Sequence, residues 1–179
     1  MLADDGNYVI LGSTKSTDGD ITDKTTSDED YWLLKVKPNG DIVWSKTYGG
    51  PEDDTASSLE KTSDGGYIVS GYSRGAGGDV SNNEGFHDFW IVKFTASGDL
   101  QWEKSYGFAG SDKAYKVIQT KDGGYIAAGV LDVTASNGEG GLGSNRSSQD
   151  LGRSVQHAGG DYWVIKLSAS GQLQWRNRI

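Results

Sequence analysis

The acidic loop at residues 16–23 has the residue types that come nearest to a metal site. It places three carboxylates, Asp18, Asp20 and Asp23, among serine and threonine hydroxyls. Oxygen ligands of this kind suit Ca²⁺. However, the loop lacks the residue order and the bidentate glutamate of an EF-hand, and aspartate is itself a common turn former. The pattern favours a turn, and calcium, the one cofactor that the sequence suggests, stays open as the alternative.

Three further aspartates, Asp30, Asp88 and Asp161, each precede an aromatic residue and a tryptophan. They could form a ring of acids around a channel. Their recurrence at one position favours a structural role, in which each carboxylate bonds to backbone amides or to a lysine of the same pattern. The two histidines, His87 and His157, lie just before the same segments but do not align, and no carboxylate motif surrounds them. Neither is expected to act as a base or a ligand.

Other active-site patterns are missing from the sequence. The chain has no cysteine, so disulfides, thiolate zinc sites and a cysteine nucleophile are excluded. It contains no G-x-S-x-G, H-E-x-x-H or P-loop motif, and the glycine-rich residues 138–143 do not follow a strand and open a helix. We therefore predict no catalytic residue and no cofactor-binding residue.

Composition narrows the class of protein further. An apolar content of 35% in 179 residues is that of a folded chain, and 27 glycines without a Gly-X-Y period indicate many tight turns. The net charge of -8, with no basic run, makes nucleic acid and anionic membranes poor partners. No apolar run approaches the roughly 20 residues of a membrane-spanning helix, and no signal peptide is visible at the amino terminus.

Two sequence blocks recur three times at a spacing of about 58 residues or more, which indicates a repeat protein. The first block, with the pattern Asp-Gly-x-Tyr, occupies residues 5–12, 64–71 and 122–129. The second is an aspartate, an aromatic residue, a tryptophan and an apolar run with a lysine, at residues 30–36, 88–94 and 161–167. A further tryptophan follows the second block in each copy, at Trp44, Trp102 and Trp175.

Each copy reads as a meander of short strands. The Asp-Gly pairs supply the positive φ angles of hairpins, and the second block has the continuous apolar character of a strand that is covered on both faces. No segment has helical periodicity, so we predict an all-β fold of four-stranded antiparallel blades of a β-propeller, in three repeats that do not close a ring. The repeats span 1–50, which lacks the first strand, 51–108, and 109–179, which has a long insertion at 138–160.

The three copies resemble tandem repeats of large secreted or surface proteins from Bacteroidetes-like bacteria and some archaea. The shared motifs are Asp-Gly-Gly-Tyr-Ile, Asp-x-Trp-(Ile/Val)-x-Lys and Gly-x-x-x-Trp, and the resemblance covers essentially the whole chain. It implies a quinoprotein-like propeller fold and a secreted or cell-surface location. It implies little about activity.

The leading functional hypothesis is a non-catalytic repeat module, serving as a scaffold, an adhesion surface or a ligand-binding surface of a larger secreted protein. A carbohydrate or protein ligand would meet the variable loops, including 138–160. One alternative is a fragment of a quinoprotein-like or glycan-active enzyme with its active site on the channel axis, and another is a calcium-stabilised stalk. Because propellers have about 4–8 blades, three blades leave apolar faces that further blades or a second copy should cover.

Overall fold

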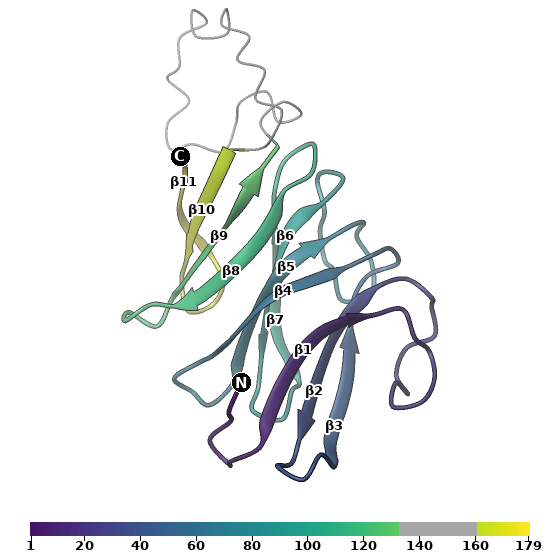
Figure 1. Cartoon of the computed structure of the whole chain (residues 1–179). Coiled ribbons are helices and arrows are strands. Elements are labelled where there is room, and N and C mark those ends of the chain that lie inside the picture. Colours follow the sequence, from purple (N-terminus) through teal and green to yellow (C-terminus); the bar gives the residue numbers. More distant parts are fainter. Residues whose placement is uncertain (133–160) are drawn as a thin grey trace, which may run out of the picture.

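The computed structural model describes residues 1–132 and 161–179, which form eleven β-strands and no helix (Figure 1). The expected insertion at 138–160 and His157 lie outside the described residues. Sheet 1 consists of β1 (Tyr8–Thr14), β2 (Asp30–Val36) and β3 (Ile42–Tyr48). Sheet 2 consists of β4 (Thr55–Lys61), β5 (Tyr67–Ser73), β6 (Asp88–Phe94) and β7 (Leu100–Tyr106). Sheet 3 consists of β8 (Lys113–Gln119), β9 (Tyr125–Leu131), β10 (Asp161–Leu167) and β11 (Leu173–Arg178).

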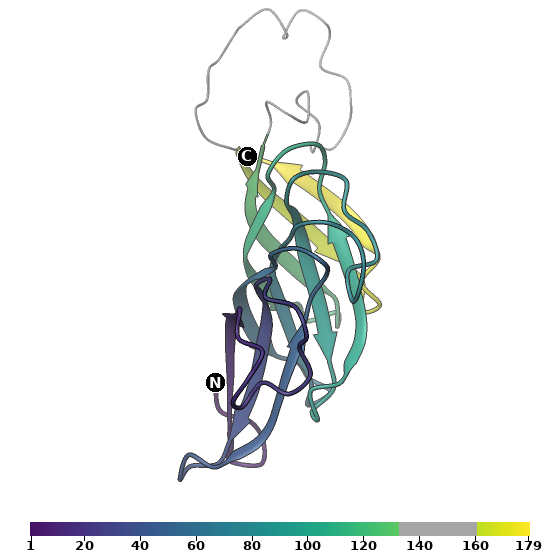
Figure 2. The same ribbon diagram turned by 90° about the vertical axis from the view of Figure 1, so that its right-hand side faces the viewer.

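All strand pairs are antiparallel, and neighbours in each sheet are neighbours in the chain, so each sheet is a simple meander. The prediction of an all-β chain built from antiparallel sheets is confirmed. The sheets follow one another, with sheet 1 at one end of the molecule and sheet 3 at the other (Figures 1 and 2). Among the described residues, no helix is long and apolar enough to cross a membrane.

A buried lysine ties the third strand of each repeat to the Asp-Gly turn that precedes the second strand. Lys93, in β6, is buried and lies 2.9 Å from the carboxylate of Asp64 in the Asp-Gly turn. The same carboxylate accepts a hydrogen bond from the Gly66 amide at 3.0 Å, and Gly65 has the positive φ of 80° that this turn requires. Equivalent ion pairs join the other lysines to their turns, at Lys35–Asp5 and Lys166–Asp122. The recurring lysine therefore pairs with the turn aspartate, not with the aspartate that begins its own strand.

The core lies between the sheets, because each sheet packs one face on the next. Tyr31 of sheet 1 and Trp90 of sheet 2 are both fully buried, with ring centroids 4.5 Å apart, and the Tyr31 hydroxyl donates to the Trp90 carbonyl. The next junction repeats the arrangement with Phe89 and Trp163, whose centroids are 4.8 Å apart. Every residue of β6 is buried, which agrees with the apolar run of residues 89–92 at its centre.

The second tryptophan of each copy packs on a glycine of the following sheet. Trp44 lies against Gly98, and Trp102 against Gly171, where a side chain on either glycine would press on the indole. Both glycines also have positive φ angles, 81° and 78°. No sheet of the described residues covers Trp175, which is 37% exposed. The expectation that the tryptophans pack between repeats thus holds for the interior positions, and the last one faces solvent.

Replacement of Trp102 and of Trp175 by alanine should therefore have unequal costs. We expect W102A to lower the free energy of unfolding by about 3 kcal/mol or more, because it leaves a cavity at the junction. W175A removes an exposed ring and should cost less than about 1 kcal/mol. Denaturant unfolding of the two variants makes the comparison, and equal costs would contradict the packing described here.

Candidate functional site

Pairs of buried aspartates occupy equivalent positions at the two sheet junctions. One aspartate of each pair, Asp54 or Asp112, lies in the link that enters a new sheet. Asp54 accepts hydrogen bonds from the amides of Gly50 at 2.6 Å and Arg74 at 3.3 Å. Asp112 accepts from Phe108 at 2.8 Å and Asp132 at 2.7 Å. These carboxylates hold the link between sheets against the loop that follows the second strand of the new sheet.

The other member of each pair begins the third strand of a repeat, as Asp30 or Asp88. Asp88 is 1% exposed, and one of its oxygens accepts from the Glu84 amide at 2.7 Å. The other oxygen, Oδ1, has no hydrogen-bond partner in either Asp30 or Asp88. A side chain at Gly49 would collide with the carboxylates of Asp30 and Asp54, and one at Gly107 with Asp88 and Asp112. Both carboxylates of a pair therefore converge on the same glycine.

Burial raises the pKa of these carboxyl groups. Desolvation is the largest cause in each case, and it outweighs the backbone hydrogen bonds that favour the charged form. The pKa of Asp54 rises to about 7, and those of Asp88 and Asp112 rise to about 6. The pKa of Asp30 is also raised by burial, although the Lys24 ammonium opposes the shift. Each pair can therefore hold a proton near neutral pH.

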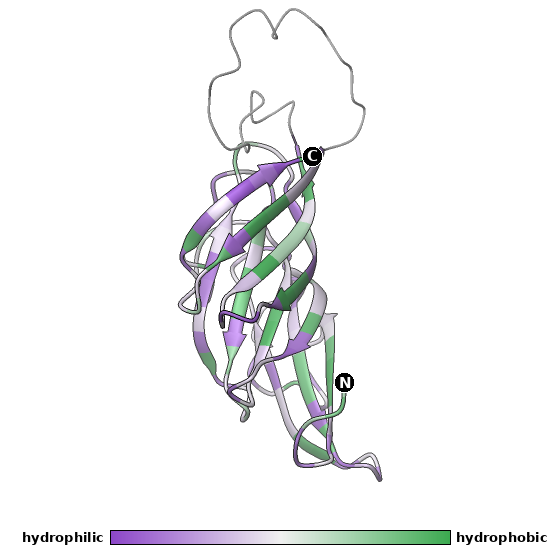
Figure 3. Cartoon of the chain, turned by 90° about the vertical axis from the view of Figure 1, so that its left-hand side faces the viewer, coloured by the Kyte–Doolittle hydropathy of each residue, from purple (hydrophilic) through white to green (hydrophobic). Residues whose placement is uncertain are grey.

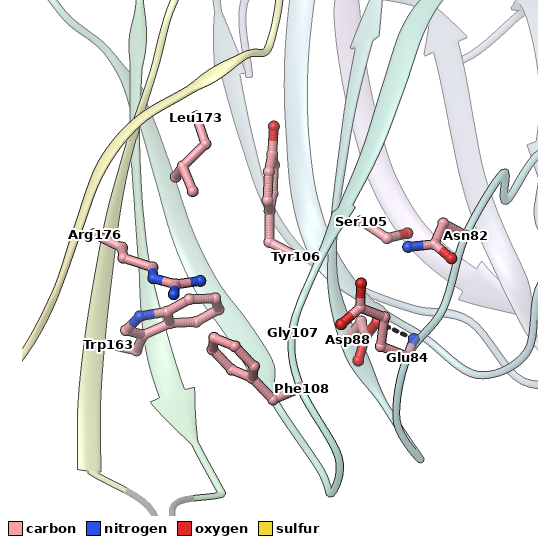
Figure 4. A pocket seen from close by; sticks show the side chains of 10 residues that line it. All are labelled: Asn82, Glu84, Asp88, Ser105, Tyr106, Gly107, Phe108, Trp163, Leu173 and Arg176. Carbon is pink, nitrogen blue, oxygen red and sulfur yellow. Dashed lines mark hydrogen bonds between the residues drawn. The ribbon is translucent and has the colours of Figure 1, made fainter. Parts of the chain in front are cut away.

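At the first junction a buried ammonium lies beside Asp30, whereas among the described residues Asp88 forms no ion pair. The Lys24 ammonium lies 2.5 Å from Asp30 Oδ2, and its side chain is 1% exposed. Counted back from the strand aspartate, the corresponding residue of the next repeat is Asn82. At this second junction a cleft of about 150 Å³ opens beside Asp88 (Figure 4).

Polar and apolar residues line opposite parts of the cleft. Asn82, Glu84, Asp88 and Ser105 lie together on one side of Gly107 (Figure 4). On the other side lie the rings of Phe108 and Trp163, together with Arg176, whose guanidinium carbon is 4.7 Å from the Phe108 ring centre. The hydroxyl of Ser105, like Asp88 Oδ1, is buried without a hydrogen-bond partner. This is the strongest candidate site in the described part of the chain.

The structure gives Asp18 and Asp23 different partners, and Asp20 is exposed. Asp18 accepts from the Ser16 hydroxyl at 2.7 Å on the surface, and Asp23 binds the amide and hydroxyl of Thr47 on β3, both at 2.8 Å. Among residues 1–132 and 161–179, no group of three or more His, Cys, Asp or Glu side chains is arranged to hold a metal ion. Calcium binding by Asp18, Asp20 and Asp23 stays a prediction.

The remaining sequence candidates are distributed over separate places. The pKa of His87 is lowered to about 4 by burial and by Lys113 and Arg74, and its ring meets the Ser111 hydroxyl at 2.9 Å. Asp161, the third strand aspartate, is partly exposed and pairs with Arg178 at 3.2 Å.

Sequence reasoning missed Asp54, Asp112, Lys24 and the cleft. The signal for the first two was present, because both stand directly before the first strand of a repeat.

Comparisons with known proteins found one distant structural match to report. No family model and no curated protein matches the sequence. Among solved structures, the chain is similar to a protein of unknown function from Bacteroides caccae, with 9% sequence identity and a TM-score of 0.19. The similarity covers 85% of this chain and 78% of that chain. A likeness this distant carries no argument about function.

The glycines between the paired carboxylates should tolerate no side chain. We expect Gly49→Ala to lower the free energy of unfolding by about 1–3 kcal/mol, because its methyl group would displace Asp30 and Asp54. Gly12→Ala in the same sheet is the matched control, since its nearest neighbour would be a Trp32 ring carbon at 3.9 Å. The control should leave stability unchanged or raise it by up to about 1 kcal/mol. Equal destabilisation of both variants in denaturant titrations would contradict the close approach.

The raised pKa values predict that the protein is most stable in mild acid. Between about pH 7 and pH 4 the folded chain binds protons at Asp54, Asp88 and Asp112 that the unfolded chain does not, so stability should rise as pH falls. The lowered pKa of His87 opposes part of this rise, with one proton against three. At lower pH the direction reverses, because the pKa of Asp5 is held at about 2 by the hydrogen bond and charge of Lys35 and the Asn7 amide. Stability from Asp5 is therefore lost as pH falls below about 4.

Denaturant unfolding at constant ionic strength should show a maximum at about pH 4–5. A steady decline in stability from pH 7 to pH 5 would show that burial does not raise the pKa of these carboxyl groups.

Proposed function

We propose that the chain is a non-catalytic scaffold module whose end sheets accept further sheets of the same repeat, in a larger secreted or cell-surface assembly. The observation that carries the proposal is that the aromatic residue before the first tryptophan of each repeat is buried in two repeats and exposed in the third. Tyr31 and Phe89 are 0% exposed, whereas Tyr162, at the same position of sheet 3, is 71% exposed. The first two pack on the next sheet, and the third has no next sheet in the described chain.

The two end faces carry complementary halves of the contact seen at the interior junctions. At those junctions, the residue equivalent to Tyr162 packs on a tryptophan and the residue equivalent to Trp175 packs on a glycine. On sheet 3, Tyr162 and Trp175 are exposed. On sheet 1, Trp32 and Gly40 occupy the positions of that tryptophan and glycine. Gly40 has a φ of 91° and nothing within 4 Å of the place where a side chain would begin, whereas Gly98 there meets Trp44. Sheet 1 of a second copy therefore has the features that the outer face of sheet 3 lacks.

Apolar exposure supports the same conclusion. The exposed large hydrophobic residues include Tyr8, Ile10 and Val43 on sheet 1. In sheet 3, hydrophobic and hydrophilic stretches alternate along the strands (Figure 3). The exposed large hydrophobic residues of this sheet include Ile118 and Leu173. Apolar faces of this kind mark interaction surfaces in soluble proteins. The secreted or surface location is supported by the resemblance of the repeat motifs.

An association of this kind is heterologous, so blocking either face should stop it in a predictable way. Tyr162→Glu places a charge on the outer face of sheet 3, and Gly40→Asn adds a side chain to the turn of sheet 1 in a conformation that asparagine tolerates. Sedimentation velocity over a series of concentrations should show association of the wild-type chain and monomers for each variant alone. An equimolar mixture of the two variants should form a dimer, because each retains the face that the other has lost.

Gly19→Asn is the control for the asparagine substitution, since Gly19 also has a positive φ, 66°, and open space around it. It should associate as the wild type does. A wild-type chain that stays monomeric throughout, or variants that fail to complement each other, would refute the proposed docking of one end on the other.

A further inference from the structure

One strand of sheet 1 has a free edge where the equivalent strands of the other sheets are paired. In sheets 2 and 3 the strand that follows the Asp-Gly turn, β5 or β9, is paired on both sides, with β4 or β8 as one of its neighbours. β1 is the equivalent strand of sheet 1, and among the described residues β2 is its only strand neighbour. We call the unpaired side of residues 10–14 the open edge of β1.

The open edge presents backbone hydrogen-bonding groups of Leu11 and Ser13. Before it, the Val9 amide donates to the Met1 carbonyl at 2.9 Å, on the side of β1 away from β2. Successive residues of a paired strand direct their backbone groups to alternate sides, so those of Leu11 and Ser13 point the same way as those of Val9. No strand of the described residues pairs with them there. Unpaired groups in a row of this kind are a template for another extended chain.

Gly12 lies at the centre of the open edge, and its equivalents show what fits beside it. A side chain on Gly71 would collide with the Thr55 carbonyl of β4, and one on Gly129 with the Lys113 carbonyl of β8. Beside Gly12 the nearest atom would be 3.9 Å away. The space that a first strand fills in the other two repeats is therefore open in sheet 1.

The adjoining face of sheet 2 is incompletely covered at the same place. Ala114 and Val117 of β8 are fully buried, and β8 contacts both β4 and β5 of the preceding sheet. Their equivalents in β4, Ala56 and Leu59, are only partly buried, and β4 contacts β1 and β2. A strand on the open edge of β1 would cover Ala56 and Leu59 as β4 covers the residues of β8.

We propose that the open edge of β1 binds an extended segment of another polypeptide, which pairs antiparallel with residues 11–13 and completes sheet 1 with a fourth strand. This site is separate from the end faces of sheets 1 and 3. The segment that fits is defined by β4 and β8, which place an alanine opposite the glycine and an aliphatic residue three positions later, with a bulge between them. Backbone hydrogen bonds supply the affinity of such strand addition, and the side-chain pattern supplies its specificity.

A peptide with the sequence of residues 54–59, acetylated and amidated at its ends, is the probe, and backbone amide shifts of the full chain are the readout. We expect saturable shifts at Leu11 and Ser13. The same peptide N-methylated at the serine equivalent to Ser58 should not bind, because Ser58 pairs with Ser70, the counterpart of Leu11.

Three outcomes would overturn the proposal. The first is the absence of shifts at Leu11 and Ser13 with millimolar peptide. The second is equal binding of the N-methylated peptide, which would show side-chain contact without strand pairing. The third is a set of shifts at residues 11–13 that depends on protein concentration and not on peptide, which would assign the edge to a second copy.

Gly12→Ala separates docking from folding. Its methyl group has room in the free chain but would collide with the carbonyl of a docked strand, as at Gly71 and Gly129. We expect an unchanged unfolding temperature and a loss of peptide affinity of about tenfold or more. Val43→Ala is the control, because Val43 is exposed on β3 at the other side of sheet 1, and it should bind the peptide as the wild type does. Full affinity in Gly12→Ala would contradict strand addition at this edge.

Discussion

Burial of one sheet face against the next is the constraint on which this structure depends. A four-stranded sheet of this length has two apolar faces, and neither can be covered from within its own repeat. The aromatic pairs Tyr31–Trp90 and Phe89–Trp163 provide that cover at the interior junctions. Because apolar burial contributes about 25 cal/mol per Å², most of the stabilisation is expected to come from these junctions and not from the separate sheets. The same residue types on the end faces then become interaction surfaces.

The polar groups of the junctions have a different role, because they position the link between sheets. Asp54 and Asp112 each accept two backbone amides, one from the end of the preceding sheet and one from a loop of the following sheet. A second carboxylate close by makes ionisation of the pair costly, and at the first junction Lys24 offsets that cost. At the second junction, Asn82 stands where Lys24 would be, and the cleft opens there. Variation at one loop position thus separates a structural junction from a candidate binding site.

The strands and turns could be predicted from sequence because their signals are local. The Asp-Gly pairs and the apolar run of residues 88–94 indicate hairpins and a buried central strand without knowledge of other repeats. The partners of the polar residues could not be predicted in the same way. The strand aspartates were expected to bond either to backbone amides or to the repeat lysine. Asp88 accepts from the Glu84 amide, and Lys93 instead binds Asp64, which the hairpin brings beside it from 29 residues away. The pairing of Asp88 with Asp112 depends on how the chain crosses from one sheet to the next, which no periodicity encodes.

The central claim is that the outer face of sheet 3 accepts sheet 1 of another copy, and energy transfer between copies tests it most directly. The chain has no cysteine, so single cysteines at the exposed positions Asp41 and Asn177 can be labelled specifically. Their counterparts at the first junction, Asp99 and Lys46, form an ion pair with atoms 2.5 Å apart. A donor at residue 41 on one copy and an acceptor at residue 177 on another should show transfer that rises with concentration. Stronger transfer between two copies labelled at the same position, or none in any combination, would contradict the account.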